Sequence, residues 1–215
     1  MVSRQILSRK FGPLEFQEET GVSRETLLKL KIYAECLHRW QRQINLIGKG
    51  SLDDLWHRHF LDSAQLWELC SLKRSRLVDL GSGAGFPGMV LSIMGRPHVE
   101  LIESNTRKCS FLCEVARVAG ASVQITNARS EDVSAPALAD FVTARAVAPL
   151  SDLLGHCFRW LKPGGVALLH KGVSVERELT QAVKDWTMQL LRHQSQTDPS
   201  GVVLEIRELA RADGQ

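Results

Sequence analysis

The sequence of 215 residues lacks the features that mark several large classes of protein. It has no apolar run of the ~18 residues that a membrane-spanning helix requires. The segment from Met1 to Phe11 alternates polar and apolar residues, whereas a signal peptide needs a continuous apolar stretch. The five cysteines form no C-x-x-C pair, which argues against a disulfide framework and a tetrahedral zinc site. We therefore expect a cytoplasmic protein with reduced thiols, no bound metal and no membrane partner.

The composition is ordinary for a globular protein, with 44% hydrophobic and 24% charged residues. This length suits one domain, whose single core is large enough to be stable without covalent cross-links. The formal net charge is +3, but residues 1–76 carry a net charge of +4 and residues 77–215 one of −1. The positive excess is either a docking surface for a polyanion or a solvated helical surface.

The N-terminal third is predicted to be helical. From Ser23 to Ile47, apolar residues recur at three- and four-residue spacing, and Ser23 is a suitable N-cap. A break at residues 48–50 precedes a shorter helical stretch from Leu52 to about Leu69. We interpret residues 1–76 as a helical extension that ends in a polar, basic connector.

After residue 76, short apolar runs alternate with helical stretches. The runs that we expect to be strands are 77–80, 99–102, 123–125, 141–143, 166–169 and 202–206. The stretches that we expect to be helices are 87–94, 106–119 and 150–160. This alternation predicts an α/β domain over residues 77–215, with a mostly parallel, doubly wound sheet that forms one compact unit with the extension.

The most specific motif follows the first predicted strand and is rich in glycine. It reads Asp79-Leu80-Gly81-Ser82-Gly83-Ala84-Gly85-Phe86-Pro87-Gly88. Glycines there permit a tight turn and a close approach of the backbone to a ligand, and the helix beyond presents free N–H groups. A dinucleotide fingerprint would need a small residue at position 86, which is phenylalanine here. The spacing therefore disfavours a nicotinamide dehydrogenase.

The motif fits S-adenosylmethionine, which has an amino-acid tail, a sulfonium, a ribose and an adenine but no pyrophosphate. Gly81, Gly83 and Gly85 can lie against the tail and the ribose. Asp79 can meet the ammonium group, directly or through water. Glu103, at the end of the second predicted strand, can accept hydrogen bonds from both ribose hydroxyls, each worth ~1.5–3 kcal/mol. The alternative is a turn that needs glycine only for packing.

The loop after the third predicted strand contains Ser130 and Glu131. In a doubly wound sheet this loop reaches the carboxyl edge, next to the expected position of the adenine. A backbone N–H of either residue is therefore a candidate contact to an adenine nitrogen. The alternative is an exposed acidic turn.

Four signatures resemble the RsmG/GidB family of small-subunit ribosomal RNA methyltransferases. In chain order they are Trp40 with Asn45-Leu46-Ile47, Arg58-His59-Phe60-Leu61-Asp62-Ser63, the loop from Asp79 to Gly88 with its Phe86-Pro87-Gly88, and Arg145-Ala146 with Lys171-Gly172. They span residues 40–172 in the order typical of the family. Two positions depart from it: Met89-Val90-Leu91 stands where many members have a proline, and Ala144 where many have a serine.

The resemblance implies a Rossmann-like class I methyltransferase that uses S-adenosyl-L-methionine to methylate N7 of one guanine in 16S rRNA, position 527 in reference numbering. Its partner would be 16S rRNA or the small ribosomal subunit, and we expect a monomer. The residues that the resemblance assigns to the cofactor are Gly81, Phe86, Ser130, Glu131 and Arg145. The alternatives are a methyltransferase of another RNA or a small molecule, and a non-catalytic RNA-binding module.

The residues are compatible with N7 chemistry, because guanine N7 has an available lone pair and needs no general base. The segment after the fourth predicted strand is not the Asn/Asp-Pro-Pro-aromatic motif of amino-group methylation, and no proline precedes a cysteine as in pyrimidine C5 enzymes. Arg145 is the expected positioning residue. Its guanidinium can contact an RNA phosphate, the guanine or the cofactor carboxylate, or form a structural ion pair with Asp140.

Candidate RNA contacts are basic side chains, because neutralising phosphates supplies most of the affinity for nucleic acid. These candidates are His57, Arg58 and Lys171. For His59 we favour a packing role, and for Asp62 the role of a helix cap. Trp40 borders the apolar stripe, so we favour a place in the core over a base-stacking platform.

Overall fold

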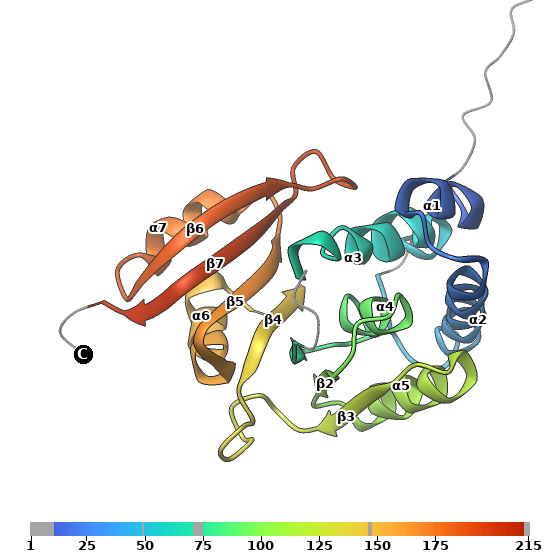
Figure 1. Ribbon diagram of the computed structural model, residues 1–215, viewed down its shortest axis with the longest axis horizontal. Helices are drawn as coiled ribbons and strands as arrows, with labels where there is room; N and C mark the ends of the chain where they lie inside the picture. The colour runs from blue at the N-terminus through green and yellow to red at the C-terminus, as the bar shows by residue number, and fades with distance from the viewer. Residues whose placement is uncertain (1–10, 49, 71–74, 146–147, 213–215) are drawn as a thin grey trace, which may run out of the picture.

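The computed structural model describes residues 11–48, 50–70, 75–145 and 148–212. Within these ranges seven strands form one sheet in the order β3-β2-β1-β4-β5-β7-β6 (Figure 1). The strands are β1 (Leu77–Leu80), β2 (Val99–Glu103), β3 (Val123–Asn127), β4 (Ala139–Arg145), β5 (Leu161–Lys171), β6 (Trp186–Gln194) and β7 (Val202–Arg211). The first five run parallel, and β7 is antiparallel to both β5 and β6.

The helices lie on both faces of this sheet. They are α1 (Pro13–Thr20), α2 (Arg24–Trp40), α4 (Gly88–Ile93), α5 (Thr106–Ala119), α6 (Leu150–Trp160) and α7 (Val175–Ala182). The segment between α2 and β1 contains η1 (Leu52–Asp54), the π-helix η2 (Trp56–Leu61), α3 (Asp62–Ala64) and η3 (Glu68–Cys70). None of the helices in the described ranges has the length and apolarity needed to cross a bilayer.

Alternate residues of the strands face two separate apolar layers, as expected for side chains of period two. Leu77 and Leu101 pack with α2, α4, α5 and the segment 52–70, whereas Val78 and Ile102 pack with α6 and α7. Figure 1 shows these helix groups at opposite ends of the molecule. The prediction of a doubly wound, mostly parallel sheet is therefore confirmed.

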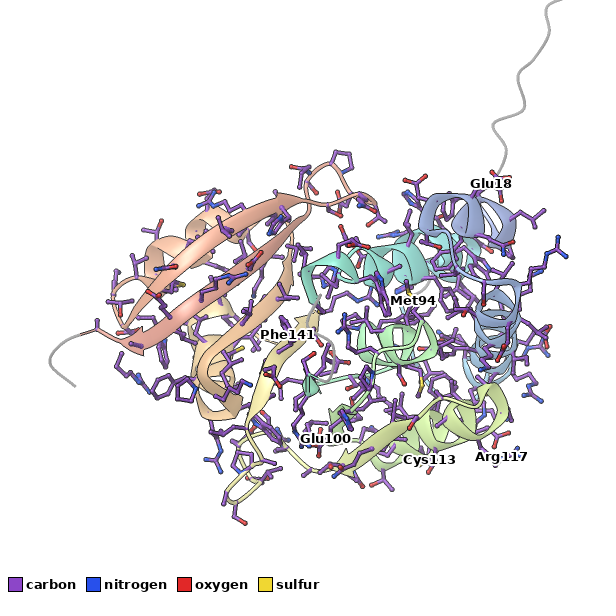
Figure 2. All side chains as sticks on the ribbon, viewed as in Figure 1. Glu18, Met94, Glu100, Cys113, Arg117 and Phe141 are labelled. Carbon is purple, nitrogen blue, oxygen red and sulfur yellow. The ribbon has the colours of Figure 1, made fainter. Side chains whose placement is uncertain are left out.

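The N-terminal helices share one core with the sheet. Phe16, Leu30 and Phe60 are fully buried in the same apolar cluster as Leu101 of β2 and Phe111 of α5. Figure 2 shows the side chains that fill the space between α2, α4 and α5, and it shows Cys113 and Arg117 on the outer face of α5. The helices before β1 thus contribute to the main hydrophobic core.

The predicted helix over residues 23–47 is shorter in the structure. Its start is confirmed, because the Ser23 hydroxyl accepts a hydrogen bond from the Thr26 N–H at 3.0 Å. The helix ends at Trp40, seven residues before the predicted end at Ile47. The Gln41 side-chain oxygen accepts the N–H groups of Leu46 and Ile47 at 3.0 and 3.1 Å. The Gln41 side chain therefore supplies the hydrogen-bond acceptor that these two N–H groups would otherwise find within a longer helix.

Candidate functional site at the carboxyl edge of the sheet

Three glycines of the loop after β1 adopt the left-handed conformation, with φ of 64° at Gly81, 58° at Gly83 and 95° at Gly85. Their surroundings differ. A Cβ atom at Gly85 would lie 2.7 Å from the Tyr33 hydroxyl oxygen, whereas one at Gly83 would meet nothing closer than the Gly81 carbonyl oxygen at 3.8 Å. The loop is therefore packed against the protein at Gly85 and open at Gly83, where a ligand can approach the backbone.

Asp79, in the strand before the loop, holds it by hydrogen bonds. Its side chain is fully buried, with Oδ1 accepting the Thr143 hydroxyl at 2.7 Å and Oδ2 accepting the Gly88 N–H at 3.3 Å. Burial raises the pKa of Asp79 to about 6. Full burial disfavours the direct contact to a ligand's ammonium group, and the contact through water stays a prediction. In the structure Asp79 binds the loop itself.

Glu103, at the end of β2, also binds the loop. Its Oε2 accepts the Gly83 N–H at 2.8 Å, and its Oε1 accepts the Asn105 N–H at 2.7 Å. Each carboxylate oxygen has two lone pairs, so both oxygens keep acceptor capacity for a ligand hydroxyl. The position at the end of β2 is the predicted one, and the contact to a ribose stays a prediction.

Ser130 and Glu131 lie in the loop after β3. The Ser130 hydroxyl is 3.0 Å from Nδ1 of His156 and 3.1 Å from Oε2 of Glu131, and the Ser130 carbonyl accepts the Trp160 indole N–H at 3.3 Å. These contacts fix the loop to α6. The contact of this loop to an adenine stays a prediction.

Arg145, the last residue of β4, joins the glycine loop to the segment 52–70. Its Nη1 donates to the Arg58 carbonyl at 3.1 Å and to Asp62 Oδ2 at 3.2 Å. Its Nη2 lies 2.6 Å from Nδ1 of His59, and its guanidinium carbon is 5.2 Å from the centre of the Phe86 ring. The suggested ion pair with Asp140 is wrong, because Asp140 and Arg145 lie at opposite ends of β4 and Asp140 pairs with Lys162.

Asp62 is the centre of a buried polar cluster. Its Oδ1 accepts hydrogen bonds from the Gln65 amide and the Thr197 hydroxyl, both at 2.8 Å. Its backbone carbonyl lies 2.9 Å from Nε2 of His170. Asp62 is the C-terminal cap residue of the π-helix, as predicted, and also the first residue of α3. It connects β4, β5 and the turn between β6 and β7.

The two histidines of this cluster are held neutral. Burial, with the nearby Arg145 cation, lowers the pKa of His59 to about 3, and burial lowers the pKa of His170 below its ordinary value. His59 is buried, as predicted. Within the described ranges, no group of three or more histidine, cysteine, aspartate or glutamate side chains is arranged to hold a metal ion.

A cavity of about 930 Å³ opens beside this cluster. Its lining includes Arg58, Asp62 and Arg145, residues of α7, and the turn between β6 and β7. Arg177 of α7 contributes an exposed guanidinium that has no ion pair with any described residue. Sequence analysis missed Arg177 because α7 itself was not predicted.

The candidate RNA contacts fall in three different settings. Arg58 lines the cavity and is exposed. His57 is outside the lining, with Nδ1 3.7 Å from Asp54 Oδ2 and its ring against Phe11. The Lys171 side chain is only 9% exposed, and its ammonium group donates to Glu178 at 2.7 Å and to the Ala148 carbonyl at 2.9 Å. This arrangement favours a structural role for Lys171 over the predicted RNA contact.

The family described as rRNA small subunit methyltransferase G matches residues 26–203. The chain belongs to this family. The match contains the glycine loop, Arg145 and most of the cavity wall, and it confirms the resemblance inferred from the four signatures. Ala146, in the fourth signature, lies outside the described residues.

Relatives named ribosomal RNA small subunit methyltransferase G align over nearly the whole chain. The protein from Paramagnetospirillum magneticum is 53% identical over 204 residues, which cover 95% of this chain and 99% of the relative. The protein from Rhodospirillum centenum is 49% identical over 210 residues, 98% of this chain and 97% of the relative.

Solved structures of other methyltransferases share the fold of this member of the methyltransferase G family. TYW2 of M. jannaschii in complex with AdoMet has a TM-score of 0.57 at 20% identity and covers 80% of each chain. The ribosomal protein L11 methylase of Lactobacillus delbrueckii has a TM-score of 0.56 at 17% identity, covering 70% of this chain and 76% of that one. The predicted class I methyltransferase fold is confirmed.

Proposed function

We propose that this chain transfers the methyl group of S-adenosylmethionine to N7 of a single guanine in 16S rRNA, at position 527 in reference numbering. One observation supports this more than any other: Arg145 contacts the Phe86 ring of the glycine loop and also lines the cavity. A cofactor on the loop and a base in the cavity would therefore meet at Arg145. Membership of the rRNA small subunit methyltransferase G family supports the reaction class.

The glycine loop fits the cofactor. The backbone is open at Gly83, and Gly81 is exposed beside it, so the amino-acid tail and the ribose can lie directly on the loop. Glu103 would accept the ribose hydroxyls with its remaining lone pairs, and the loop with Ser130 and Glu131 would border the adenine. The cofactor supplies a methyl group on a positively charged sulfur. Asp79 would shape the loop and reach the ammonium group through water.

The cavity fits the target nucleotide. Its volume of about 930 Å³ is in the range of nucleotide-sized ligand sites. Arg58 and Arg177 would pair with phosphates at the rim. His59 and His170 stay neutral, and neither is needed as a base, because N7 attacks with a lone pair that carries no proton.

Arg145 would position the guanine without opposing its charge. The purine ring becomes positively charged as it accepts the methyl group, and an unpaired guanidinium nearby would raise the energy of that state. Here Asp62 Oδ2 lies 3.2 Å from Arg145 Nη1 and largely neutralises it. The pair can thus donate a hydrogen bond, for example to guanine O6, at little electrostatic cost.

We further propose two parts of the chain, a partner and a location in the cell. Residues 1–76 would be a helical extension with basic surface, and residues 77–215 the cofactor-binding domain, the two packed as one unit. The partner would be 16S rRNA or the small ribosomal subunit, and the protein a monomer in the cytoplasm.

The test uses methyl-labelled S-adenosylmethionine and small subunits from a strain that lacks this modification. Label at N7 of one guanine, mapped to position 527, is the expected result. Label on another nucleotide would refute the assigned position, and label on protein only would refute RNA as the substrate. The Arg145→Ala variant serves as the low-turnover control, and naked 16S rRNA in a parallel reaction distinguishes free from assembled substrate.

A further inference from the structure

The chain contains a single tyrosine, and its hydroxyl group reaches the glycine loop from the N-terminal extension. Tyr33 is a fully buried residue of α2, and its hydroxyl donates a hydrogen bond to the Ala84 carbonyl, 51 residues further along the chain. Ala84 lies between Gly83 and Gly85. A buried tyrosine hydroxyl needs a partner, and this partner is the backbone of the candidate cofactor site.

The tyrosine ring also packs against the end of the loop. It stacks on the Phe86 ring with centres 5.3 Å apart and planes 20° apart, and the Phe60 ring meets it edge-on at 5.2 Å. The Tyr33 hydroxyl occupies the space that a Cβ atom at Gly85 would need. Burial raises the pKa of Tyr33 well above its ordinary value, so the hydroxyl keeps its proton and remains a donor.

Three contacts with backbone polar groups hold the middle of the loop. Glu103 accepts the Gly83 N–H at 2.8 Å, the Ser82 carbonyl accepts the Gly85 N–H at 2.7 Å, and Tyr33 donates to the Ala84 carbonyl. Without the Tyr33 hydroxyl, the peptide between Ala84 and Gly85 keeps only the bond from the Gly85 N–H to Ser82, and its orientation is held less firmly because the flanking glycines tolerate many backbone conformations. A turned peptide would direct a carbonyl oxygen at the ligand side.

We propose that Tyr33 is a positioning residue for the cofactor loop, so that the N-terminal extension completes the S-adenosylmethionine site as well as the core. The inference depends on the proposed function, since it assumes that this loop binds the cofactor. A loop that already has its binding conformation loses little conformational entropy when the ligand binds. If only a fraction of the molecules have that conformation, the apparent affinity falls by that fraction.

The first experiment compares Tyr33→Phe with the parent, both as full chains, by calorimetric titration with S-adenosylhomocysteine. Phenylalanine keeps the ring that stacks on Phe86 and removes only the hydroxyl. We expect the dissociation constant to rise about tenfold, equivalent to ~1.4 kcal/mol, with turnover at saturating cofactor within about twofold of the parent. Trp40→Leu is the control: Trp40 lies on the same helix and packs edge-on against Phe111, so it should lower stability and leave the dissociation constant unchanged.

A second measurement keeps the Tyr33 hydroxyl and changes one ring hydrogen to fluorine. Because the chain has one tyrosine, biosynthetic replacement by 3-fluorotyrosine gives a single fluorine resonance at position 33. We expect this resonance to shift on titration with S-adenosylhomocysteine, with the same dissociation constant as calorimetry, and to stay unchanged with NAD.

The outcomes separate this inference from the proposed function. A parent protein that binds no S-adenosylhomocysteine would refute the proposed function itself. A parent that binds it, with an unmoved fluorine resonance and a Tyr33→Phe variant of parental affinity, would overturn only the role of Tyr33. Equal weakening by Tyr33→Phe and Trp40→Leu would reduce that role to general stability.

Discussion

The glycine loop and the cavity lie side by side at the carboxyl edge of the sheet, yet they are built in different ways. Backbone groups fix the loop: the Gly83 and Gly88 N–H groups and the Ala84 carbonyl each have a side-chain partner. The cavity also has contacts between side chains: Asp62 accepts hydrogen bonds from both Arg145 and Thr197. A substitution in the loop must therefore disturb the main chain, whereas one in the cavity can change charge and leave the main chain in place.

The largest effect is expected in the loop, from Gly85→Ala. The new Cβ would lie 2.7 Å from the Tyr33 hydroxyl oxygen and 2.9 Å from Met89 Cβ, at a φ of 95° that alanine rarely adopts. We expect affinity for S-adenosylhomocysteine to fall by at least about a hundredfold, ~3 kcal/mol, measured by calorimetry. Gly120→Ala is the matched control: φ is 64° but nothing lies within 4 Å, so it should cost only ~1–2 kcal/mol of stability and no affinity.

In the cavity, Arg145→Ala should act on turnover. It leaves the Asp62 carboxylate buried without its cation and removes the proposed contact to the base. We expect kcat to fall about a hundredfold while the dissociation constant of S-adenosylhomocysteine changes by less than about threefold. Arg117→Ala, which breaks an exposed ion pair with Glu114 on α5, is the control and should change neither. Methylation by Arg145→Ala at the parental rate would exclude the positioning role.

The two regions also differ in how pH changes their contribution to stability: the fold raises the pKa of Asp79 and lowers that of His59. The pKa of Asp79 is raised from 3.8 to about 6 in the fold, so the folded state retains a proton that the unfolded chain has lost, and stability falls as pH rises through that window, by about 3 kcal/mol. The pKa of His59 is lowered from 6.5 to about 3 in the fold. Between these two pH values His59 is protonated in the unfolded chain and neutral in the folded state. Stability therefore falls as pH drops from 6.5 towards 3.

Urea unfolding between pH 4 and 7 measures these two contributions separately. Asp79→Asn should remove the decline with rising pH, since one amide can still accept the Gly88 N–H and donate to Thr143. His59→Gln should remove part of the loss on the acid side, by a few kcal/mol. Relative to the parent, the two stability curves should diverge in opposite directions. Parallel curves for both variants would show that these groups do not titrate as assigned.

The smallest effect is expected at the rim of the cavity, from Arg58→Ala. The Arg58 backbone carbonyl accepts from Arg145, and this contact survives the loss of the side chain. We expect binding to rRNA to depend less steeply on salt, with the slope reduced by about one, and turnover at low salt to be retained. Arg192→Ala, which removes an exposed ion pair with Glu176, is the control for general surface charge. An unchanged slope would assign Arg58 to structure.

The spacing of apolar residues and the position of glycine predicted the helices whose ends depend on neighbouring residues in the sequence. The helices over 106–119 and 150–160 have the predicted bounds, and Gly120 ends the first of them in the left-handed conformation. β6 escaped prediction because it is an edge strand with several exposed polar residues, and α7 because only Leu179 and Ala182 of its eight residues are buried. Short elements of this kind are stabilised by their neighbours in the fold.

The site was predicted only where a residue type carries the chemistry. The glycine loop and Glu103 are where the pattern indicated, because their spacing follows from a strand and a turn. The environment of Lys171 was not predictable, since its partner Glu178 is on the missed α7. Tyr33 had one usable signal: a lone tyrosine on an apolar stripe needs an acceptor, but sequence spacing does not identify an acceptor 51 residues away.

The contacts between Asp62 and Thr197 and between Gln65 and Gln196 join parts of the chain that are 135 and 131 residues apart. The contact between Tyr33 and Ala84, in contrast, joins two residues of the first half of the chain. The wall of the cavity can close only when the residues around 197, near the end of the 215-residue chain, have been synthesised. The proposed RNA site of a nascent polypeptide would therefore be complete only when its synthesis has almost ended.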